Sequence, residues 1–594
     1  MIKTLPEMLL HTIEAYPKDD FMLYKKGESY VPLSTSEFGR WTRLFALGLH
    51  ELGIRSGDRV VILSENRPEW VMTDFATLSL GGITVPIYTT LAPDQVRYII
   101  ENSGARIVVC SDLELWQKVA AIKAELPQVD HFVLFDADTP EGVISLRDVW
   151  DRGEKQDNED SGLFAELCRR AQPDDVATII YTSGTTGIPK GVMLTHKNLV
   201  SNAEAVLSQI PVTQADTVLS FLPLSHILER WATCCYIYVG ATIGYAESLE
   251  TLSDNMLEIR PTIMVTVPRL LEKIYARVLD TVLSGSGMKR AIFYWAVGVG
   301  RAFAQKKVRG EDVPGFLAFK RKIASKLVFS KIYARTGGRL RFFVSGGAPL
   351  AKEIGEIFYA LGLLALEGYG LTESSPAIAF NRPEELKFGS VGKPVPGVEV
   401  RIAEDGEILA RGPNIMKGYY RMEEATREAF EGEWFKTGDV GHIDEEGFLV
   451  ITDRKKDILV TSGGKNVAPQ PIENLLKSTP YILNAVVLGD RRKFISALIV
   501  PDLDKLEAYA RRKGIDFLDR EKLVQDQAIR TFMDQEVDKA QANLAQYEKI
   551  KKFALLDRDF ELESGEVTPS LKVKRNIIEK KYSQLIDSLY EGQD

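Results

Sequence analysis

Residues 181–191, which read YTSGTTGIPKG, constrain the fold of this chain more than any other stretch. The run before them, residues 176–181 (VATIIY), is apolar and mostly β-branched and therefore predicts a buried strand. Gly184, Gly187 and Gly191 let the backbone curl directly after that strand. Backbone amides, Ser/Thr hydroxyls and the ammonium of Lys190 in one turn are typical of a phosphate-binding loop. A plain surface turn rich in Gly, Ser and Thr is the alternative.

The loop is not of the P-loop NTPase type. That pattern needs a glycine directly before the lysine and a Ser or Thr directly after it. Here Pro189 precedes Lys190 and Gly191 follows it. The residues after the loop lead into a segment that is expected to become helical from about Lys197.

Length, charge and cysteine content bound the class of protein. A chain of 594 residues corresponds to about four domain-sized units. The net charge of −9 argues against nucleic acid as a partner. The four cysteines show no CxxC spacing, so we expect buried thiols in a reducing compartment and no zinc site. Six scattered histidines without an HExxH pattern indicate no transition-metal centre.

The sequence predicts neither a signal peptide nor a membrane-spanning helix. The N-terminus lacks an apolar core of signal-peptide length, and no window reaches 18 uncharged apolar residues. We therefore expect a cytoplasmic protein. Peripheral attachment to a membrane surface stays open.

Strand-like and helix-like runs alternate along most of the chain and predict an α/β fold. This alternation favours mainly parallel sheets covered by helices on both faces. We expect an N-terminal α/β subdomain (1–175), a second α/β subdomain (176–390), a small β subdomain (391–453) and an α+β C-terminal domain (454–594). Residues 153–175 begin polar and acidic and are expected to form an exposed connection.

One segment departs from the acidic character of the chain. Residues 284–341 hold fourteen Lys and Arg residues against two acidic ones, Glu311 and Asp312, with aromatic residues interleaved. This composition fits an anionic membrane surface or a groove for an anionic ligand. A pair of helices with an apolar core face and a solvated basic face is the alternative.

Seven further strings carry residue types suited to nucleotide and acyl chemistry. Read singly, each is also compatible with an ordinary Gly-rich turn, a core histidine or a solvated charge cluster. They are LPLSHILER (222–230), SGGAP (345–349), EGYGLTESSP (367–376), WFKTGD (434–439), DRKKD (453–457), TSGGKN (461–466) and TPSLKVKR (568–575).

Taken together and in order, these strings resemble the adenylate-forming (AMP-binding) superfamily. The LPLSHILER string and the TPSLKVKR ending resemble its long-chain fatty acyl-CoA synthetase branch, as does the charged insert at about 501–566. Most other branches carry Ser-Gly-Lys where this chain has Ser570, Leu571 and Lys572. The lysine stays aligned, and the leucine in place of glycine leaves the exact shape of the loop open.

The resemblance implies an ATP-dependent enzyme with two half-reactions. A fatty carboxylate attacks the α-phosphate of ATP to give acyl-AMP and pyrophosphate, and the thiol of the co-substrate CoA then displaces AMP. It implies triphosphate contacts from Lys190 and from the amides and hydroxyls of residues 182–186, and Mg²⁺ at Glu373 with Thr182. The residues implied to bind nucleotide or cofactor are Thr182, Ser183, Gly184, Thr185, Thr186, Gly187, Lys190, Gly347, Ala348, Tyr369, Gly370, Thr372, Asp439, Arg454, Lys456, Gly463 and Gly464.

Within that set the resemblance gives some residues distinct roles. Tyr369 would stack on adenine, and Asp439 would hold the ribose with support from Arg454. Lys572 would stabilise charge on the α-phosphate, as expected for electrostatic catalysis of phosphoryl chemistry. The C-terminal domain would then rotate about Lys456 to bring Gly463 and Gly464 to CoA. His226 would line the acyl pocket or the thioester path.

Other functions remain alternatives at this point. The acceptor can be a carrier-protein thiol, and the acid can be short or aromatic. A non-catalytic nucleotide-responsive or membrane-scaffold protein is an alternative of another class. The retention of Lys190, Glu373, Asp439 and Lys572 speaks against it.

Overall fold

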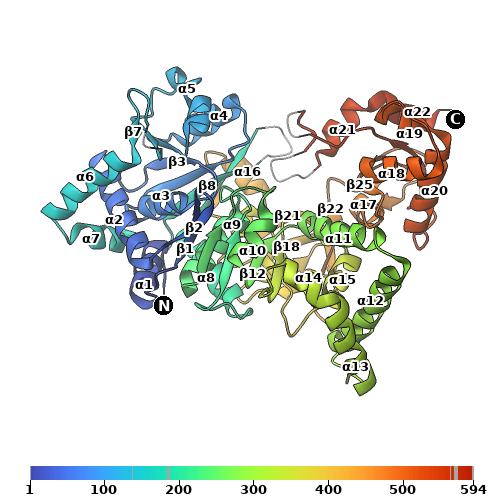
Figure 1. Ribbon diagram of the computed structural model, residues 1–594. Helices are drawn as coiled ribbons and strands as arrows, with labels where there is room; N and C mark the ends of the chain where they lie inside the picture. The colour runs from blue at the N-terminus through green and yellow to red at the C-terminus, as the bar shows by residue number, and fades with distance from the viewer. Residues whose placement is uncertain (1, 137, 183–187, 562–563, 568–572, 592–594) are drawn as a thin grey trace.

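Two large sheets layered with helices form the body of the protein. The computed structural model describes residues 2–136, 138–182, 188–561, 564–567 and 573–591. In Figure 1 the N-terminal elements and the two sheets lie to the left and centre, and the C-terminal elements form a separate cluster at the upper right. The α/β fold class expected from the sequence, with mixed sheets and an α+β C-terminal part, is confirmed.

The first sheet has eight strands and is parallel from β8 to β7. Its strands are nearly continuous apolar runs because helices bury both faces, which is typical of parallel sheets. The order across the sheet is β19 (Gly418–Tyr419), β9 (Lys190–Thr195), β8 (Val176–Thr182), β4 (Ile83–Ile87), β3 (Arg59–Leu63), β5 (Ile107–Cys110), β6 (His131–Leu134) and β7 (Ile144–Ser145).

The second sheet has nine strands and mixes parallel and antiparallel pairs. Its order is β16 (Lys393–Pro394), β15 (Ala377–Phe380), β14 (Leu364–Gly370), β13 (Phe342–Ser345), β12 (Ile263–Thr266), β10 (Thr217–Ser220), β11 (Thr242–Tyr245), β1 (Met22–Lys26) and β2 (Ser29–Leu33). Sheet membership does not follow sequence order. β1 and β2 join this second sheet, whereas β8 and β9 join the first, so the sheets interleave across the predicted boundary at 175/176.

Smaller sheets complete the chain toward its C-terminus. An antiparallel sheet contains β17 (Glu399–Ile402), β18 (Glu407–Arg411), β20 (Phe430–Glu431), β21 (Trp434–Ile443) and β22 (Leu449–Arg454). The C-terminal part contains the two-stranded pair β23 (Leu459–Val460) and β24 (Asn466–Val467). It also holds a three-stranded sheet of β25 (Ile482–Leu488), β26 (Ile495–Pro501) and β27 (Ile550–Leu555).

Helices of ordinary length cover the sheets. Those up to residue 283 are α1 (Leu5–Ala15), α2 (Thr35–Glu51), α3 (Pro68–Ser79), α4 (Pro93–Ser103), α5 (Leu113–Ala120), α6 (Leu146–Glu159), α7 (Leu163–Arg170), α8 (His196–Leu207), α9 (Ile227–Val239), α10 (Leu252–Ile259) and α11 (Pro268–Leu283). The later ones are α12 (Gly287–Val308), α13 (Gly315–Ala324), α14 (Ser330–Arg335), α15 (Lys352–Leu361), α16 (Glu423–Glu428), α17 (Pro469–Lys477), α18 (Leu503–Lys513), α19 (Arg520–Gln525), α20 (Gln527–Ala540), α21 (Arg575–Lys581) and α22 (Ser583–Tyr590).

Residues 153–175 are not the exposed connection that their composition predicted. They contribute the end of α6 and the whole of α7, which buries Phe164, Leu167 and Cys168. A side chain at Gly153 would place its Cβ within 1.8 Å of the Leu44 carbonyl oxygen, so α6 packs backbone to backbone against α2. The packing overrides the polar composition.

All four cysteines are buried and free, as expected from their spacing. In the part of the chain that the structure describes, no helix has the length and hydropathy to span a bilayer.

A buried ion pair connects helices α3 and α9, which follow strands of the first and the second large sheet, respectively. Asp74 lies on α3, which is buried along nearly its whole length, and Arg230 lies on α9. The Arg230 guanidinium donates to both Asp74 oxygens, at 2.6 and 2.8 Å. Charged groups in a core need such bidentate pairing, because an unpaired buried charge is strongly destabilising.

We expect Asp74→Ala to lower the free energy of unfolding by about 3–5 kcal/mol, because Arg230 would remain buried without its counter-ion. Urea denaturation followed by circular dichroism measures the change. Glu154→Ala is the matched control, since it removes the exposed Arg40–Glu154 pair at 3.1 Å and should leave the curve unchanged. Equal urea midpoints for the two variants would contradict the role given to the buried pair.

Candidate active site

The predicted phosphate loop connects two antiparallel strands. β8 ends at Thr182 and β9 begins at Lys190, and these two residues pair across the ladder. The helix expected from about Lys197 is confirmed, since α8 starts at His196; the residues between loop and helix, 190–195, form the strand β9, which the sequence did not predict. Val192 and Leu194, which are buried, explain why residues 190–195 form a strand. Ser183, Gly184, Thr185, Thr186 and Gly187 lie outside the described residues.

Tyr419 brings Lys190 and Glu373 together. The Lys190 ammonium lies 4.8 Å from the centroid of the Tyr419 ring, within cation–π range. The Tyr419 hydroxyl donates to Glu373 Oε1 at 3.0 Å. β19, which holds Tyr419, pairs with β9, which holds Lys190, so the contact follows from the sheet. Lys190 and Glu373, which are 183 residues apart in the sequence, therefore flank one ring.

Glu373 belongs to a short 3₁₀ turn that follows β14. The turn spans Thr372–Ser374, and the Glu373 carbonyl accepts from the Met416 amide at 2.8 Å. Gly370 precedes it at a close backbone approach, where a Cβ would lie 1.7 Å from the Pro376 carbonyl oxygen. A side chain would clash there, so this close approach of the backbone requires glycine.

A buried carboxylate lies at the centre of the second cluster. The Tyr369 hydroxyl donates to Asp439 Oδ2 at 2.7 Å, and Arg454 Nε lies 2.8 Å from Asp439 Oδ1. Asp439 on β21 pairs directly with Arg454 on β22. Burial, and then the charge of Asp439, raise the pKa of the Tyr369 hydroxyl well above its ordinary value. The tyrosine is therefore a neutral donor to a charged acceptor.

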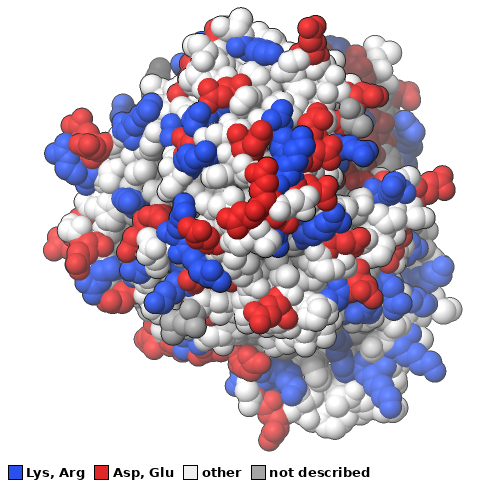
Figure 2. All heavy atoms as spheres, turned by 90° about the vertical axis from the view of Figure 1, so that its left-hand side faces the viewer, with Lys and Arg blue, Asp and Glu red and all other residues white. Residues whose placement is uncertain are grey.

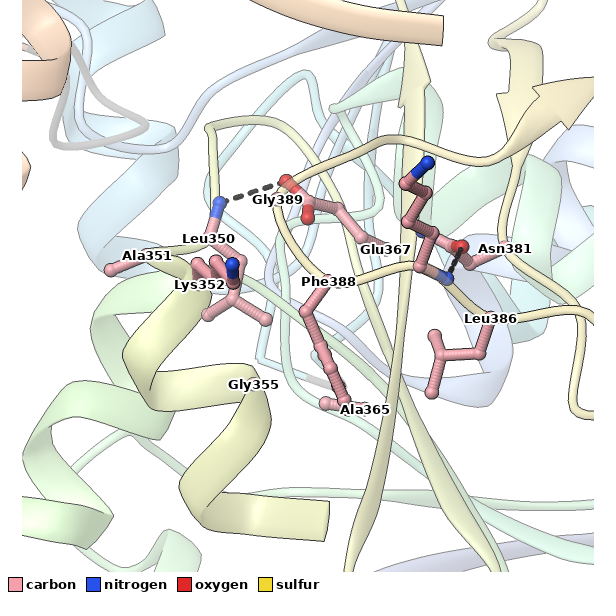
Figure 3. A pocket seen from close by; sticks show the side chains of 11 residues that line it. Leu350, Ala351, Lys352, Gly355, Ala365, Glu367, Asn381, Leu386, Phe388 and Gly389 are labelled. Carbon is pink, nitrogen blue, oxygen red and sulfur yellow. Dashed lines mark hydrogen bonds between the residues drawn. The ribbon is translucent and has the colours of Figure 1, made fainter. Parts of the chain in front are cut away.

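The turn with Gly347 and Ala348 follows β13 and lies beside a small pocket. Gly347 has φ +78°, a left-handed conformation that favours glycine. Figure 3 shows the Glu367 side chain directed toward the backbone of Leu350 across this pocket, and the Leu350 amide donates to Glu367 Oε1 at 2.9 Å. Burial raises the pKa of Glu367 to about 8.

His226 caps a helix. It lies at the N-cap of α9, and its Nδ1 accepts from the Leu228 amide at 3.2 Å. Its ring packs edge-on against Tyr88, with centroids 6.4 Å apart. Asn66 holds the preceding turn, because its amide donates to the Leu222 carbonyl at 2.6 Å. The imidazole is thus fixed in orientation at the carboxyl end of β10.

The predicted C-terminal residues lie on short turns. Gly463 and Gly464 form the exposed turn between β23 and β24, with Gly464 at φ +73°. Lys456 follows Arg454 closely, and burial lowers the pKa of its ammonium. Lys572 lies outside the described residues. α11 contacts the C-terminal part through the Arg269–Asp559 pair at 3.1 Å.

Sequence reasoning missed Tyr419 and the carboxyl of Glu367. Tyr419 occurs in a Gly-Tyr-Tyr string between two matched motifs, where an aromatic beside a glycine was an available signal. Glu367 opens the matched string 367–376, but nothing in the sequence indicates that it is buried.

The family models match nearly the whole chain. A model described as AMP-binding enzyme matches residues 9–420, and one described as AMP-binding enzyme C-terminal domain matches residues 456–594. The chain therefore belongs to the AMP-binding enzyme family, and the resemblance inferred from its motifs is confirmed.

Curated relatives cover the chain from end to end. Long-chain-fatty-acid–CoA ligase FadD15 of Mycobacterium tuberculosis is 38% identical over 586 residues, which are 97% of this chain and 95% of the relative. Long-chain-fatty-acid–CoA ligase ACSBG2 of Xenopus laevis is 31% identical over 636 residues, with 99% of this chain and 85% of the relative covered. The similarity therefore includes both matched regions.

Solved structures share the fold. The anthranilate CoA ligase AuaEII in complex with anthranoyl-AMP superposes with a TM-score of 0.73 at 20% identity, covering 99% of this chain and 98% of that one. The Mycobacterium tuberculosis fatty acyl CoA synthetase gives a TM-score of 0.59 at 24% identity, covering 98% and 99%.

We expect stability to depend on pH through Glu367. Between its ordinary pKa of 4.5 and the folded value of about 8, the carboxyl is ionised in the unfolded chain and neutral in the folded one. Its contribution to the free energy of unfolding is therefore complete below pH 4.5 and falls as the pH rises toward 8.

Glu367→Gln keeps a neutral acceptor for the Leu350 amide and removes this titration. Urea denaturation from pH 5 to 9 should show the Gln variant gaining stability over the wild type as the pH rises. Glu154→Gln, an exposed change, should run parallel to the wild type. A pH-independent difference between Glu367→Gln and the wild type would contradict the assignment.

Proposed function

We infer that this chain is an ATP-dependent, AMP-forming long-chain fatty acid–CoA ligase. The observation that carries this function is the end-to-end similarity to long-chain-fatty-acid–CoA ligases at up to 38% identity. The clusters around Tyr419 and Asp439 support it, because a lysine, two carboxylates and aromatic rings are residue types suited to binding a nucleotide and its phosphates. The substrates are a fatty acid, ATP and CoA.

In the first half-reaction the chain's task is positioning and charge stabilisation. Tyr369 and the Gly347–Ala348 backbone would face the adenine, and Asp439 with Arg454 would hold the ribose hydroxyls. Lys190 and residues 182–186 would contact the β- and γ-phosphates. The fatty carboxylate oxygen forms the bond to the α-phosphorus while the bond to pyrophosphate breaks, and Lys572 stabilises the charge in this step.

Glu373 and Thr182 are the residues that would hold Mg²⁺. A carboxylate and a hydroxyl suit this hard cation, which binds through few protein oxygens and keeps several waters. Tyr419 contacts both the Glu373 carboxylate, through its hydroxyl, and the Lys190 ammonium, through its ring. The residues present therefore fit a metal–triphosphate complex. Bound Mg²⁺ supplies neutralisation of phosphate charge.

In the second half-reaction the CoA sulfur bonds to the acyl carbon and the AMP phosphate oxygen leaves. We propose that the region after Lys456 rotates between the two steps and carries the Gly463–Gly464 turn to CoA. The exposed position of this turn supports the proposal. His226 has a fixed orientation and would line the acyl pocket or the thioester path.

The region 284–341 supports one further part of the proposal, a cytoplasmic enzyme in peripheral contact with a membrane. It holds fourteen basic residues, although the whole chain has a net charge of −9. Such a segment is drawn to anionic surfaces.

A panel of acids from short to long chain, assayed for AMP release with and without CoA, tests the function. We expect CoA-dependent AMP release that is highest for long-chain acids. An activity that peaks with short or aromatic acids, or that needs a carrier protein instead of CoA, would support the alternative acyl-AMP ligase or acyl-CoA synthetase. Zero pyrophosphate exchange with every acid would reject an enzyme of this class.

Lys572→Ala should separate the two half-reactions. We expect adenylation to slow by about 10²–10³-fold, because one donor to the transition-state charge is lost. Conversion of supplied acyl-adenylate to acyl-CoA should stay near wild type. Single-turnover assays of each step measure both rates, and Lys580→Ala, an exposed change on α21, is the control. An equal loss in both steps would reject the role proposed for Lys572.

A further inference from the structure

α12 and α13 form an arm that extends away from the large sheets (Figure 1, lower right). The arm is anchored on its inner side, where Phe293, Ala296 and Phe329 are buried with α15 residues. A Cβ at Gly300 would lie 2.5 Å from the Ala360 carbonyl oxygen, so α12 packs tightly on α15. The inner face therefore satisfies the ordinary need of an amphipathic helix to bury its apolar side.

The outward face of α12 is also apolar. Ala291, Trp295, Gly298 and Ala302 follow the spacing i, i+4, i+7 and i+11, which places them on one side of the helix, and all four are exposed. No heavy atom outside the local chain lies within 4 Å of a Cβ built at Gly298, so this side is open. Met288, one turn earlier, is 74% exposed.

α13 repeats this arrangement with larger side chains. Phe316, Phe319, Ile323 and the following Leu327 are spaced along one side, and their exposed fractions are 70%, 60%, 37% and 45%. The Lys320 ammonium lies 4.3 Å from the centroid of the Phe316 ring. Lysines thus border an exposed aromatic stripe, which is the pattern of helices that lie in a membrane interface.

The charged residues of the segment 284–341, which contains the arm, are almost all basic. Within 284–341, only Glu311 and Asp312 oppose the fourteen Lys and Arg residues, and Glu311 is already paired with Lys306 at 2.8 Å. By contrast, the face in Figure 2 intermixes basic and acidic side chains over most of its area. A solvated helix needs neither this excess of charge nor exposed phenylalanines.

We propose that the arm docks on the surface of an anionic lipid bilayer. The apolar stripes of α12 and α13 enter the headgroup–acyl boundary, and Lys320, Lys322 and Lys326 pair with lipid phosphates. Phe, Trp and Leu with flanking lysines suit that boundary. The biological purpose rests on the proposed function, because a long-chain acid partitions into bilayers and the arm would hold the enzyme at its source.

Vesicle co-sedimentation of the full chain tests the proposal. We expect binding to phosphatidylcholine vesicles that contain phosphatidylglycerol, and binding at least about tenfold weaker to pure phosphatidylcholine. Phe316→Ser/Phe319→Ser should weaken binding by about tenfold or more through lost apolar burial. Lys320→Glu/Lys322→Glu/Lys326→Glu should weaken it by at least about tenfold and reduce its salt dependence.

Leu518→Ser is the matched control, since Leu518 is 92% exposed but lies in the C-terminal part. It should bind vesicles like the wild type. Equal binding of all variants, or equal binding to both lipid mixtures, would overturn the proposal. Sedimentation that depends on an added protein partner and not on the lipid would overturn it as well.

Ligase activity on an acid presented in detergent separates the proposal from the proposed function. All arm variants should keep wild-type activity there, because their substitutions lie outside the nucleotide clusters. Vesicle binding without any ligase activity would leave the arm assignment standing and reject the proposed function. Full activity without vesicle binding would reject the arm assignment and leave the proposed function standing.

Discussion

The carboxylate of Asp439 fixes how three parts of the chain meet. It is buried at 4% exposure, and burying a carboxylate is costly unless charged or hydrogen-bonded partners compensate it. Tyr369 supplies one partner from β14 of the nine-stranded sheet, and Arg454 supplies the other from the end of β22. These bonds connect β14 of one sheet to β21 and β22 of another. The nucleotide cluster is therefore held together up to Arg454, just before Lys456, after which the C-terminal region is proposed to rotate.

Much of the fold was predictable because its physical causes are local. The strand β3 covers the apolar, β-branched run Arg59–Leu63, and the helix α18 covers the helically periodic stretch Leu503–Lys513. The rest depends on distant packing. β1 pairs with β11, more than 200 residues later, and α7 forms in a polar stretch because it packs on α3 and α1. The sequence of β1 or of α7 does not by itself indicate the element with which it packs.

The candidate site divides in the same way. The residue types at 369, 439 and 454 came from motif resemblance, but only the fold shows that they share one carboxylate. Lys190 was expected in a turn ahead of a helix, and it begins a strand that leads into α8 and whose neighbour β19 supplies Tyr419. Cross-strand neighbours depend on sheet order. The motifs therefore indicated which residue types take part in the chemistry. The order of the strands in the sheets determined which of these residues lie together.

Charge distribution gives the arm a defined orientation toward a surface. The chain carries −9 overall although residues 284–341 are strongly basic, so the remainder is more acidic than the total. An anionic bilayer attracts the arm and repels the rest, and the attraction acts within about 10 Å. The molecule would approach arm first. Exposed side chains such as Phe316 would then be the first apolar groups to reach the interface, where their burial converts electrostatic attraction into docking.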